Sequence, residues 1–242
     1  EQLVELANAK NLTLQVGHIE RFNPALRTIR NQIDKVAFIE AHRLSPYPFR
    51  STDIGVIMDV MIHDLDIILS LVNSKVTEIR ATATPVLSKK YEDISNVRLQ
   101  FESGCVANIT ASRISDKVAR KMRMFCKSKY VNLDFAAKQA WIYTKTAKLD
   151  DPNFKVEETD ISGIDNLMQF VFNDLINVEH VDINSEGEPL RAELDAFLKA
   201  VETGQRPEVD GEDGVRAIAL AHDILAACKA HNQTHGQKFL ES

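Results

Sequence analysis

A largely apolar stretch, residues 55–68, contains three side chains whose types and spacing suit acid–base chemistry. Asp59, His63 and Asp66 are four and three residues apart, so on an α-helix they share one face. A carboxylate one turn from an imidazole can accept a hydrogen bond from one ring nitrogen, which leaves the other nitrogen for proton transfer. Because the carboxylate also favours the imidazolium, the spacing of Asp59 and His63 predicts an acid–base pair that works near neutral pH.

Two other interpretations fit the same residues. Asp59 and His63 could be a buried polar pair that only anchors the helix, since histidines are common in protein cores. His63 and Asp59 could also share a metal ion, but no second cluster of ligands stands out, and we predict no metal site. Three widely separated cysteines predict neither a disulfide framework nor a cysteine zinc site.

Composition restricts the class of protein. The chain has 242 residues, of which 44% are hydrophobic and 26% charged, proportions typical of a soluble globular protein with a sizeable core. A net charge of −6 argues against a nucleic-acid-binding protein. Neither a signal peptide nor a run of about 18 apolar residues is present, so we expect no membrane association and a cytoplasmic location.

The elements that must position these side chains can be read from hydrophobic periodicity. Asn23 and Pro24 predict a helix start, because Asn is a good N-cap and Pro suits the first turn. We predict helices at 1–10, 23–33, 54–72, 188–203 and 213–231, and strands at 12–16, 36–44, 76–85, 97–101, 105–111, 119–126, 130–135, 139–144 and 154–159. This order predicts an α+β fold, with an open, mainly antiparallel sheet and helices on one face.

Apolar stripes on the last two predicted helices are expected to face the core. The first stripe comprises Leu190, Leu194, Phe197, Leu198 and Val201, and the second comprises Val215, Ile218, Ala219, His222 and Leu225. Gly204 lies where a helix C-cap is expected.

Three segments together resemble one enzyme family. They are Gly55-x-x-x-Asp59-x-x-x-His63, the segment 16–24 (Val-Gly-His-Ile-Glu-Arg-Phe-Asn-Pro), and the turn 204–214 with its Gly-Glu-Asp-Gly end. In this order, with strands between them, they resemble the glucose-fructose oxidoreductase/inositol dehydrogenase/MocA (Gfo/Idh/MocA) family of NAD(P)-dependent sugar oxidoreductases. The resemblance implies an N-terminal Rossmann domain followed by an α+β domain whose open sheet often mediates oligomerisation.

The resemblance also implies a domain division. Residues 1–22 would be the last helix and strand of a Rossmann domain, and residues 23–242 the substrate-binding and oligomerisation domain. The chain starts within an amphipathic pattern and contains neither a G-x-G-x-x-G loop nor the family's Glu-Lys-Pro motif. We therefore expect that the chain lacks the nucleotide-binding half and that the fragment alone is inactive.

On the family pattern, His63 would be the general base for a secondary sugar hydroxyl, and Asp59 would orient it or bind substrate. Hydride would pass to NAD or NADP while the base removes the hydroxyl proton. Arg21 would lie near the domain junction, where the family approaches the cofactor.

Substrate contacts are predicted for Arg43, Tyr47, Arg50 and Arg113. The tract 113–129 holds seven Lys and Arg residues against one acid, which indicates an anionic ligand such as the diphosphate of a nucleotide-sugar. The segment from Arg43 onward is also similar to that of the subgroup that oxidises UDP-N-acetylglucosamine-type sugars at the 3-hydroxyl.

Two functions of other classes remain open at this point. One is a non-catalytic module retained for homo-oligomerisation through the open sheet face. The other is a metal-dependent hydrolase or epimerase that uses Asp59, His63 and Asp66.

Overall fold

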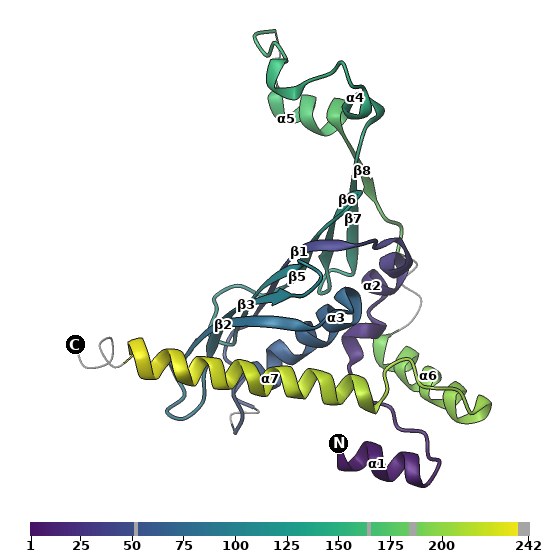
Figure 1. Ribbon diagram of the computed structural model, residues 1–242, viewed down its shortest axis with the longest axis vertical. Coiled ribbons are helices and arrows are strands. Elements are labelled where there is room, and N and C mark those ends of the chain that lie inside the picture. Colours follow the sequence, from purple (N-terminus) through teal and green to yellow (C-terminus); the bar gives the residue numbers. More distant parts are fainter. Residues whose placement is uncertain (51–52, 164–165, 184–187, 237–242) are drawn as a thin grey trace.

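An eight-stranded sheet forms the body of the protein in the computed structural model, which describes residues 1–50, 53–163, 166–183 and 188–236 (Figure 1). The strand order is β2-β3-β4-β1-β5-β6-β7-β8, and every neighbouring pair is antiparallel except β1 and β4. The strands are β1 Val36–Leu44, β2 Val76–Thr84, β3 Ile94–Phe101, β4 Val106–Ser112, β5 Ala119–Cys126, β6 Lys129–Asp134, β7 Gln139–Lys145 and β8 Ile176–His180.

Helices cover one face of this sheet, which confirms the predicted fold class (Figure 1). The helices are α1 Gln2–Ala9, α2 Pro24–Ile29, α3 Ile62–Val72, α4 Ala147–Asp150, α5 Leu167–Phe170, α6 Pro189–Thr203 and α7 Gly211–His231. Helices α3 and α7 pack against each other, and α7 also packs along β2. Helices α4 and α5 lie in an arm between β7 and β8 that projects from the body in Figure 1.

Alternation along the strands separates the two faces. In β5, Met122 and Met124 are buried beneath the helices, whereas Lys121 and Arg123 are exposed on the opposite face, which we call the open face. Buried aliphatic side chains of β1, β3, β4, β5 and β6 meet α3 and α7 in one hydrophobic core. Burial of this apolar area is the main stabilising contribution that the sheet receives.

Two predicted strands are wrong. Residues 12–16 form only an isolated bridge between Gln15 and Asp210. The backbone beside them belongs to the short segment before α7, which pairs with too few of their backbone groups to form a strand. Residues 154–159 contain a 3-10 turn, Val156–Glu158, and the edge of the sheet is taken instead by the unpredicted strand β8. The other predicted strands and helices are present, with shifts of a few residues at their ends.

The predicted core-facing stripe of α6 is wrong, and that of α7 is wrong in part, because Leu225 packs against the core but Ile218 is exposed. Helix α7 packs against β2 and α3 and buries Ala217, Leu220, Ala221, Ile224 and Cys228, whereas it leaves His222 exposed. In α6, four apolar side chains are more than half exposed: Leu190, Leu194, Leu198 and Val201. Gly204 does end α6 in the left-handed conformation, at φ 67°.

Candidate active site

A π-turn, Ile57–Met61, begins the helical segment that carries Asp59 and His63. Its first amides are satisfied by Glu92, whose carbonyl accepts from Val56 N–H at 3.0 Å and whose Oε1 accepts from Ile57 N–H at 3.2 Å. A Cβ atom on residue 55 would collide with the Glu92 carboxylate, so the glycine permits this contact. Wide π-turns are frequent at functional sites.

The predicted hydrogen bond between Asp59 and His63 is absent among the described residues, which corrects the expected geometry. Asp59 lies in the π-turn, where backbone bonds run from i to i+5, whereas His63 lies in the α-helix that follows, so the two residues do not belong to one regular α-helix. Both residues are half-buried, and Nδ1 of His63 is buried without a hydrogen-bond partner. The imidazole therefore keeps partial access to solvent while one of its nitrogens remains unpaired.

Charged groups from three elements surround His63. Arg43, on β1, donates from Nε and Nη2 to the two carboxylate oxygens of Asp64 at 2.9 and 2.8 Å, and from Nη1 to Glu20 Oε1 at 2.7 Å. We call Glu20, Arg43 and Asp64 the Arg43 cluster. Burial alone would lower the pKa of Arg43, but Asp64 and Glu20 outweigh it and raise that pKa, so the guanidinium stays charged.

The environment of His63 favours the neutral imidazole. Burial lowers the pKa of His63, and the positive charge of Arg43 lowers it further, against the opposing effects of Glu20 and Asp64. The net shift is thus opposite to the imidazolium expected from the spacing of Asp59 and His63. A neutral ring at neutral pH is ready to accept a proton.

His18 lies in the same region and was not predicted to belong to the site. It is buried, its Nε2 atom has no hydrogen-bond partner, and that atom lies 3.8 Å from Oδ1 of Asp66. Burial lowers the pKa of His18, although Asp66 opposes the shift. Its charged form would in turn disfavour the imidazolium of His63.

Because the pKa values of His18 and His63 are lowered, we expect the folded protein to lose stability in mild acid. Their pKa values are lowered on folding, so the unfolded chain binds more protons and the free energy of unfolding decreases as pH falls below about 6.5. Urea unfolding at pH 7.5, 6.5 and 5.5 should show this decrease, and single variants His18→Gln and His63→Gln should show a shallower one. The exposed control His222→Gln should keep the original slope, and equal slopes in all four proteins would contradict the prediction.

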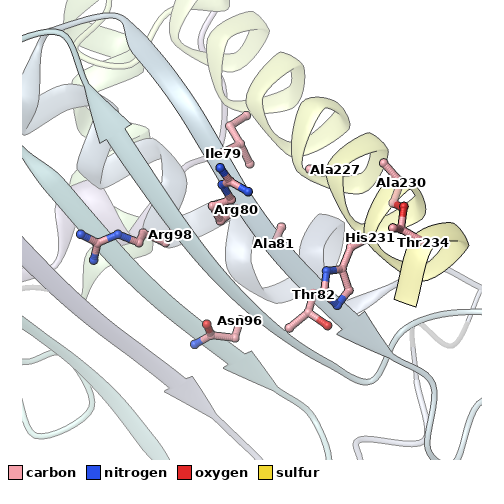
Figure 2. A pocket seen from close by; sticks show the side chains of 10 residues that line it. All are labelled: Ile79, Arg80, Ala81, Thr82, Asn96, Arg98, Ala227, Ala230, His231 and Thr234. Atoms are coloured by element: carbon pink, nitrogen blue, oxygen red, sulfur yellow. The ribbon is translucent and has the colours of Figure 1, made fainter. Parts of the chain in front are cut away.

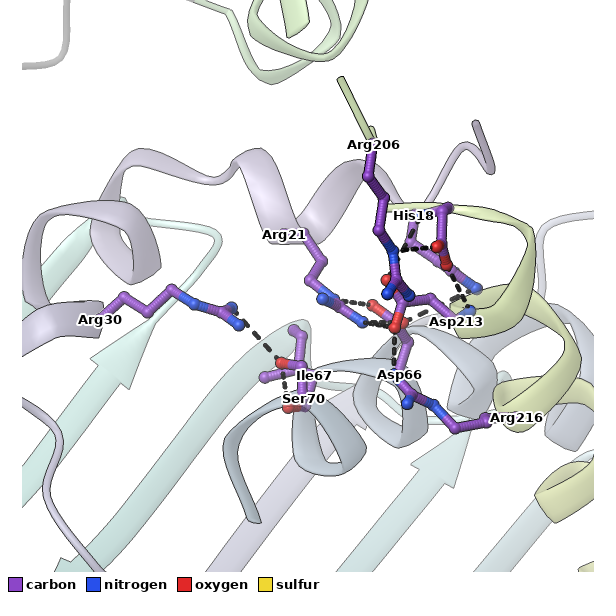
Figure 3. Close-up of polar contacts among 10 residues, drawn as sticks. His18, Arg21, Arg30, Asp66, Ile67, Ser70, Arg206, Asp213 and Arg216 are labelled. Atoms are coloured by element: carbon purple, nitrogen blue, oxygen red, sulfur yellow. Dashed lines mark hydrogen bonds and ion pairs between the residues drawn. The ribbon is translucent and has the colours of Figure 1, made fainter. Parts of the chain in front are cut away.

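A second buried cluster joins three distant segments (Figure 3). Arg21 donates from Nε and Nη2 to the two oxygens of Asp66 on α3, both at 2.7 Å, and its Nη2 lies 3.4 Å from Oδ1 of Asp213 on α7. We call Arg21, Asp66 and Asp213 the Arg21 cluster. Asp213 also forms a capping box with Asp210 at the start of α7 and contacts Arg216.

The Arg21 cluster bears on two predicted roles, cofactor binding by Arg21 and the alternative role of Asp66 in a metal-dependent enzyme. The guanidinium of Arg21 is buried and engaged by two carboxylates, so its present contacts are structural, and cofactor binding by Arg21 stays a prediction. Both oxygens of Asp66 accept from Arg21. In the described part of the chain, no three or more His, Cys, Asp or Glu side chains gather as metal ligands.

Arg113 is enclosed just beyond the end of β4. It is 0% exposed, and it donates from Nε to Asp93 Oδ1 at 2.9 Å, from Nη1 to the carbonyl of Ile54 at 2.8 Å, and from Nη2 to Ser88 Oγ at 3.0 Å. These bonds tie the loop before β3 to the backbone that precedes the π-turn. Asp93 also accepts bonds from loop amides, and despite its burial these contacts hold its pKa far below the usual range.

The four predicted substrate contacts thus differ in accessibility. Arg43 and Arg113 are buried with their guanidinium groups engaged. Tyr47 is half-buried, lies under the Arg113 guanidinium at 5.6 Å and shares a 3.3 Å hydrogen bond with Ser88, while Arg50 is exposed. Substrate binding by these four residues stays a prediction.

Sequence reasoning missed His18, Glu20 and Asp64. One signal was available: His18, Glu20 and Arg21 place three ionisable side chains in a single short segment next to an N-cap, and the structure buries all three. Such groups are rarely buried without partners. The partners Arg43 of Glu20 and Asp66 of Arg21, which lie 23 and 45 residues away along the chain, had no local signal.

A cavity of about 670 Å³ lies elsewhere, between the β2 edge of the sheet and α7 (Figure 2). Arg80 and Arg98, which are cross-strand neighbours, line it together with polar side chains of β2, β3 and the C-terminal end of α7. None of the predicted site residues lines this cavity.

Comparisons with known proteins assign the fold to a class of oxidoreductase domain. A model of the GFO/IDH/MocA C-terminal domain matches residues 29–129. The UDP-N-acetylglucosamine 3-dehydrogenase of Acidithiobacillus ferrooxidans is 32% identical over 234 residues, which is 96% of this chain and 68% of that protein. The chain belongs to the GFO/IDH/MocA family of oxidoreductases.

Solved structures agree with this assignment. The crystal form P21 of the same Acidithiobacillus enzyme, GnnA, has a TM-score of 0.79 at 31% identity, with 95% of this chain and 66% of that chain covered. An aldose-aldose oxidoreductase from Caulobacter crescentus has a TM-score of 0.68 at 17% identity, covering 94% and 65%, and so shares the fold. The chain thus spans about two thirds of the length of these relatives.

Among the described helices, none is both long and apolar enough to cross a bilayer.

Proposed function

We propose that this chain is the substrate-binding half of an NAD(P)-dependent oxidoreductase that oxidises a secondary hydroxyl of a nucleotide-sugar to a ketone. The observation that carries the proposal is His63, a partly accessible imidazole held neutral by burial and by Arg43. The similar enzyme from Acidithiobacillus ferrooxidans, named for UDP-N-acetylglucosamine, supports this substrate class.

In this proposal His63 takes the hydroxyl proton as hydride leaves the same carbon. The Arg43 cluster contributes by fixing the charge around the ring, because Asp64 follows His63 directly and is held in place by two hydrogen bonds from Arg43. Asp59 is half-buried one helical turn before His63 and makes no hydrogen bond to it among the described residues, so we assign Asp59 to substrate orientation rather than to the ring.

A dinucleotide does not fit the residues of this chain alone. The described residues contain no strand followed by a glycine-rich phosphate loop, residues 12–16 are not in a sheet, and the Arg21 guanidinium is engaged by Asp66 and Asp213. We therefore propose that NAD or NADP is held by a dinucleotide-binding half of which residues 1–22 are only the C-terminal remnant, and that the chain by itself has no turnover.

We further propose that the protein forms a homo-oligomer through the open face of the sheet. A row of aromatic side chains crosses it, with ring centroids 5.8 Å apart for Phe38 and Phe125, 4.7 Å for Phe125 and Tyr130, and 4.8 Å for Tyr130 and Tyr143. Aromatic residues are enriched in protein interfaces. The same row would serve the alternative, a non-catalytic dimerisation module.

The proposal is tested by assaying the chain joined to a dinucleotide-binding half. We expect UDP-N-acetylglucosamine or a related UDP-sugar to reduce NAD or NADP, followed by nicotinamide absorbance, and we expect no turnover from residues 1–242 alone. Absence of turnover with any UDP-sugar in a joined protein that binds the dinucleotide would contradict the proposed reaction and favour the interaction module.

A further inference from the structure

The basic tract 113–129 is divided between the two faces of the sheet. Lys121 and Arg123 point to the open face, where Lys121 lies 3.4 Å from Asp134 and Arg123 is paired with Glu40. Arg120 points to the opposite, helix-covered face, because it is the cross-strand partner of Arg43. Arg120 is thus the residue of β5 that brings positive charge from the tract to the Arg43 cluster.

Arg120 lies at the boundary between this buried cluster and solvent. Its Nη1 atom is 3.7 Å from Oε1 of Glu20, the atom that already accepts from Arg43 at 2.7 Å. The Arg120 side chain is 55% exposed, whereas those of Glu20 and Arg43 are buried. Because Arg43 compensates Glu20 at the shorter distance, Arg120 can turn to a ligand without leaving the Glu20 carboxylate unpaired.

A chain of contacts joins His63 to Arg120. Asp64 follows His63 directly and accepts two hydrogen bonds from Arg43, Arg43 also bonds to Glu20, and Arg120 lies 3.7 Å from the same Glu20 oxygen. In a sugar nucleotide, the phosphate on the anomeric carbon is separated from a ring hydroxyl by the width of one sugar ring. A guanidinium recognises phosphate oxygens through paired, charge-assisted hydrogen bonds.

We propose that Arg120 binds the phosphate of the nucleotide-sugar and so makes the site specific for phosphorylated over free sugars. This inference rests on the proposed function, since it assumes that the sugar lies at His63. Arg113, from the same tract, is enclosed by Asp93, Ser88 and the carbonyl of Ile54, and offers no comparable exposed group.

The test is calorimetric titration of residues 1–242 with UDP and with uridine. We expect UDP to bind the original chain about 10- to 100-fold more tightly than it binds Arg120→Gln, the range for one charge-assisted contact, while uridine binds both alike. The matched control Arg123→Gln, three residues along the same strand but on the open face, should bind UDP like the original chain. Circular dichroism melting should show that both variants remain folded.

Three results would overturn the inference: no UDP binding by the original chain, unchanged UDP affinity in Arg120→Gln, or an equal loss in Arg123→Gln. Its failure is distinguishable from failure of the proposed function. If the joined enzyme oxidises UDP-sugars with the same KM when Arg120 is replaced, the reaction is supported and the inference is wrong. If UDP affinity depends on Arg120 but no UDP-sugar is oxidised, the anion site is supported and the reaction is wrong.

Discussion

Replacement of His63 by glutamine is expected to lower kcat of the joined enzyme by about 100- to 10,000-fold, the usual contribution of a positioned general base. Glutamine keeps polarity and approximate size but cannot take up the hydroxyl proton. KM for the UDP-sugar and affinity for the dinucleotide should change little, because the variant removes proton transfer rather than binding. Steady-state kinetics with nicotinamide absorbance measure both parameters.

The pH profile distinguishes a base from a structural histidine. The original enzyme should lose kcat as pH falls through the lowered pKa of His63, and His63→Gln should lack this dependence. The control His222→Gln changes an exposed histidine of α7 and should leave kcat intact. Near-normal turnover in His63→Gln would remove this residue from the mechanism.

Replacement of Arg113 by methionine is expected to lower the free energy of unfolding by about 3–5 kcal/mol, as when one partner of a buried ion pair is removed. Methionine fills much of the volume but leaves Asp93 as an uncompensated buried carboxylate and frees the Ile54 carbonyl and Ser88. Urea unfolding of residues 1–242, followed by circular dichroism, measures the change.

The matched control for this prediction is Arg80→Met. Arg80 pairs with Glu78 on the surface, so its loss should change the free energy of unfolding by less than about 1 kcal/mol. Equal changes in the free energy of unfolding of the two variants would contradict the prediction that the buried contacts of Arg113 stabilise the fold. A folded Arg113→Met protein with weakened UDP binding would then favour the direct substrate contact predicted from the sequence.

Periodicity predicted most of the fold because most elements have one buried face. The hairpin of β3 and β4 alternates cleanly, and Asn23 with Pro24 starts α2 as its cap chemistry requires. Residues 12–16 have an apolar strand composition, but a strand also needs a neighbour, and that requirement depends on tertiary structure. The stripe of α6 and part of that of α7 were misassigned for the same reason, since periodicity gives a helix face but not the element that it meets.

The site was predictable to the level of one helix. Its motif located Asp59 and His63, whereas the π-turn that contains Asp59 depends on Gly55 and on Glu92, more than thirty residues away. The identities of the charged groups around His63 were equally inaccessible, because Arg43 reaches Asp64 across 21 residues and Glu20 across 23. Complementary charges that meet only on folding leave no periodic pattern in a single sequence.

The Arg21 cluster has a consequence for motion. Arg21 links its own short segment to α3 through Asp66 and to the first turn of α7 through Asp213, and opening any one of these contacts would expose buried charge. Slow hydrogen exchange should therefore extend together over these three segments, as one cooperative foldon. The histidine-bearing helix would then depend for its rigidity on the first turn of α7, and loosening of that turn would increase the motion of His63.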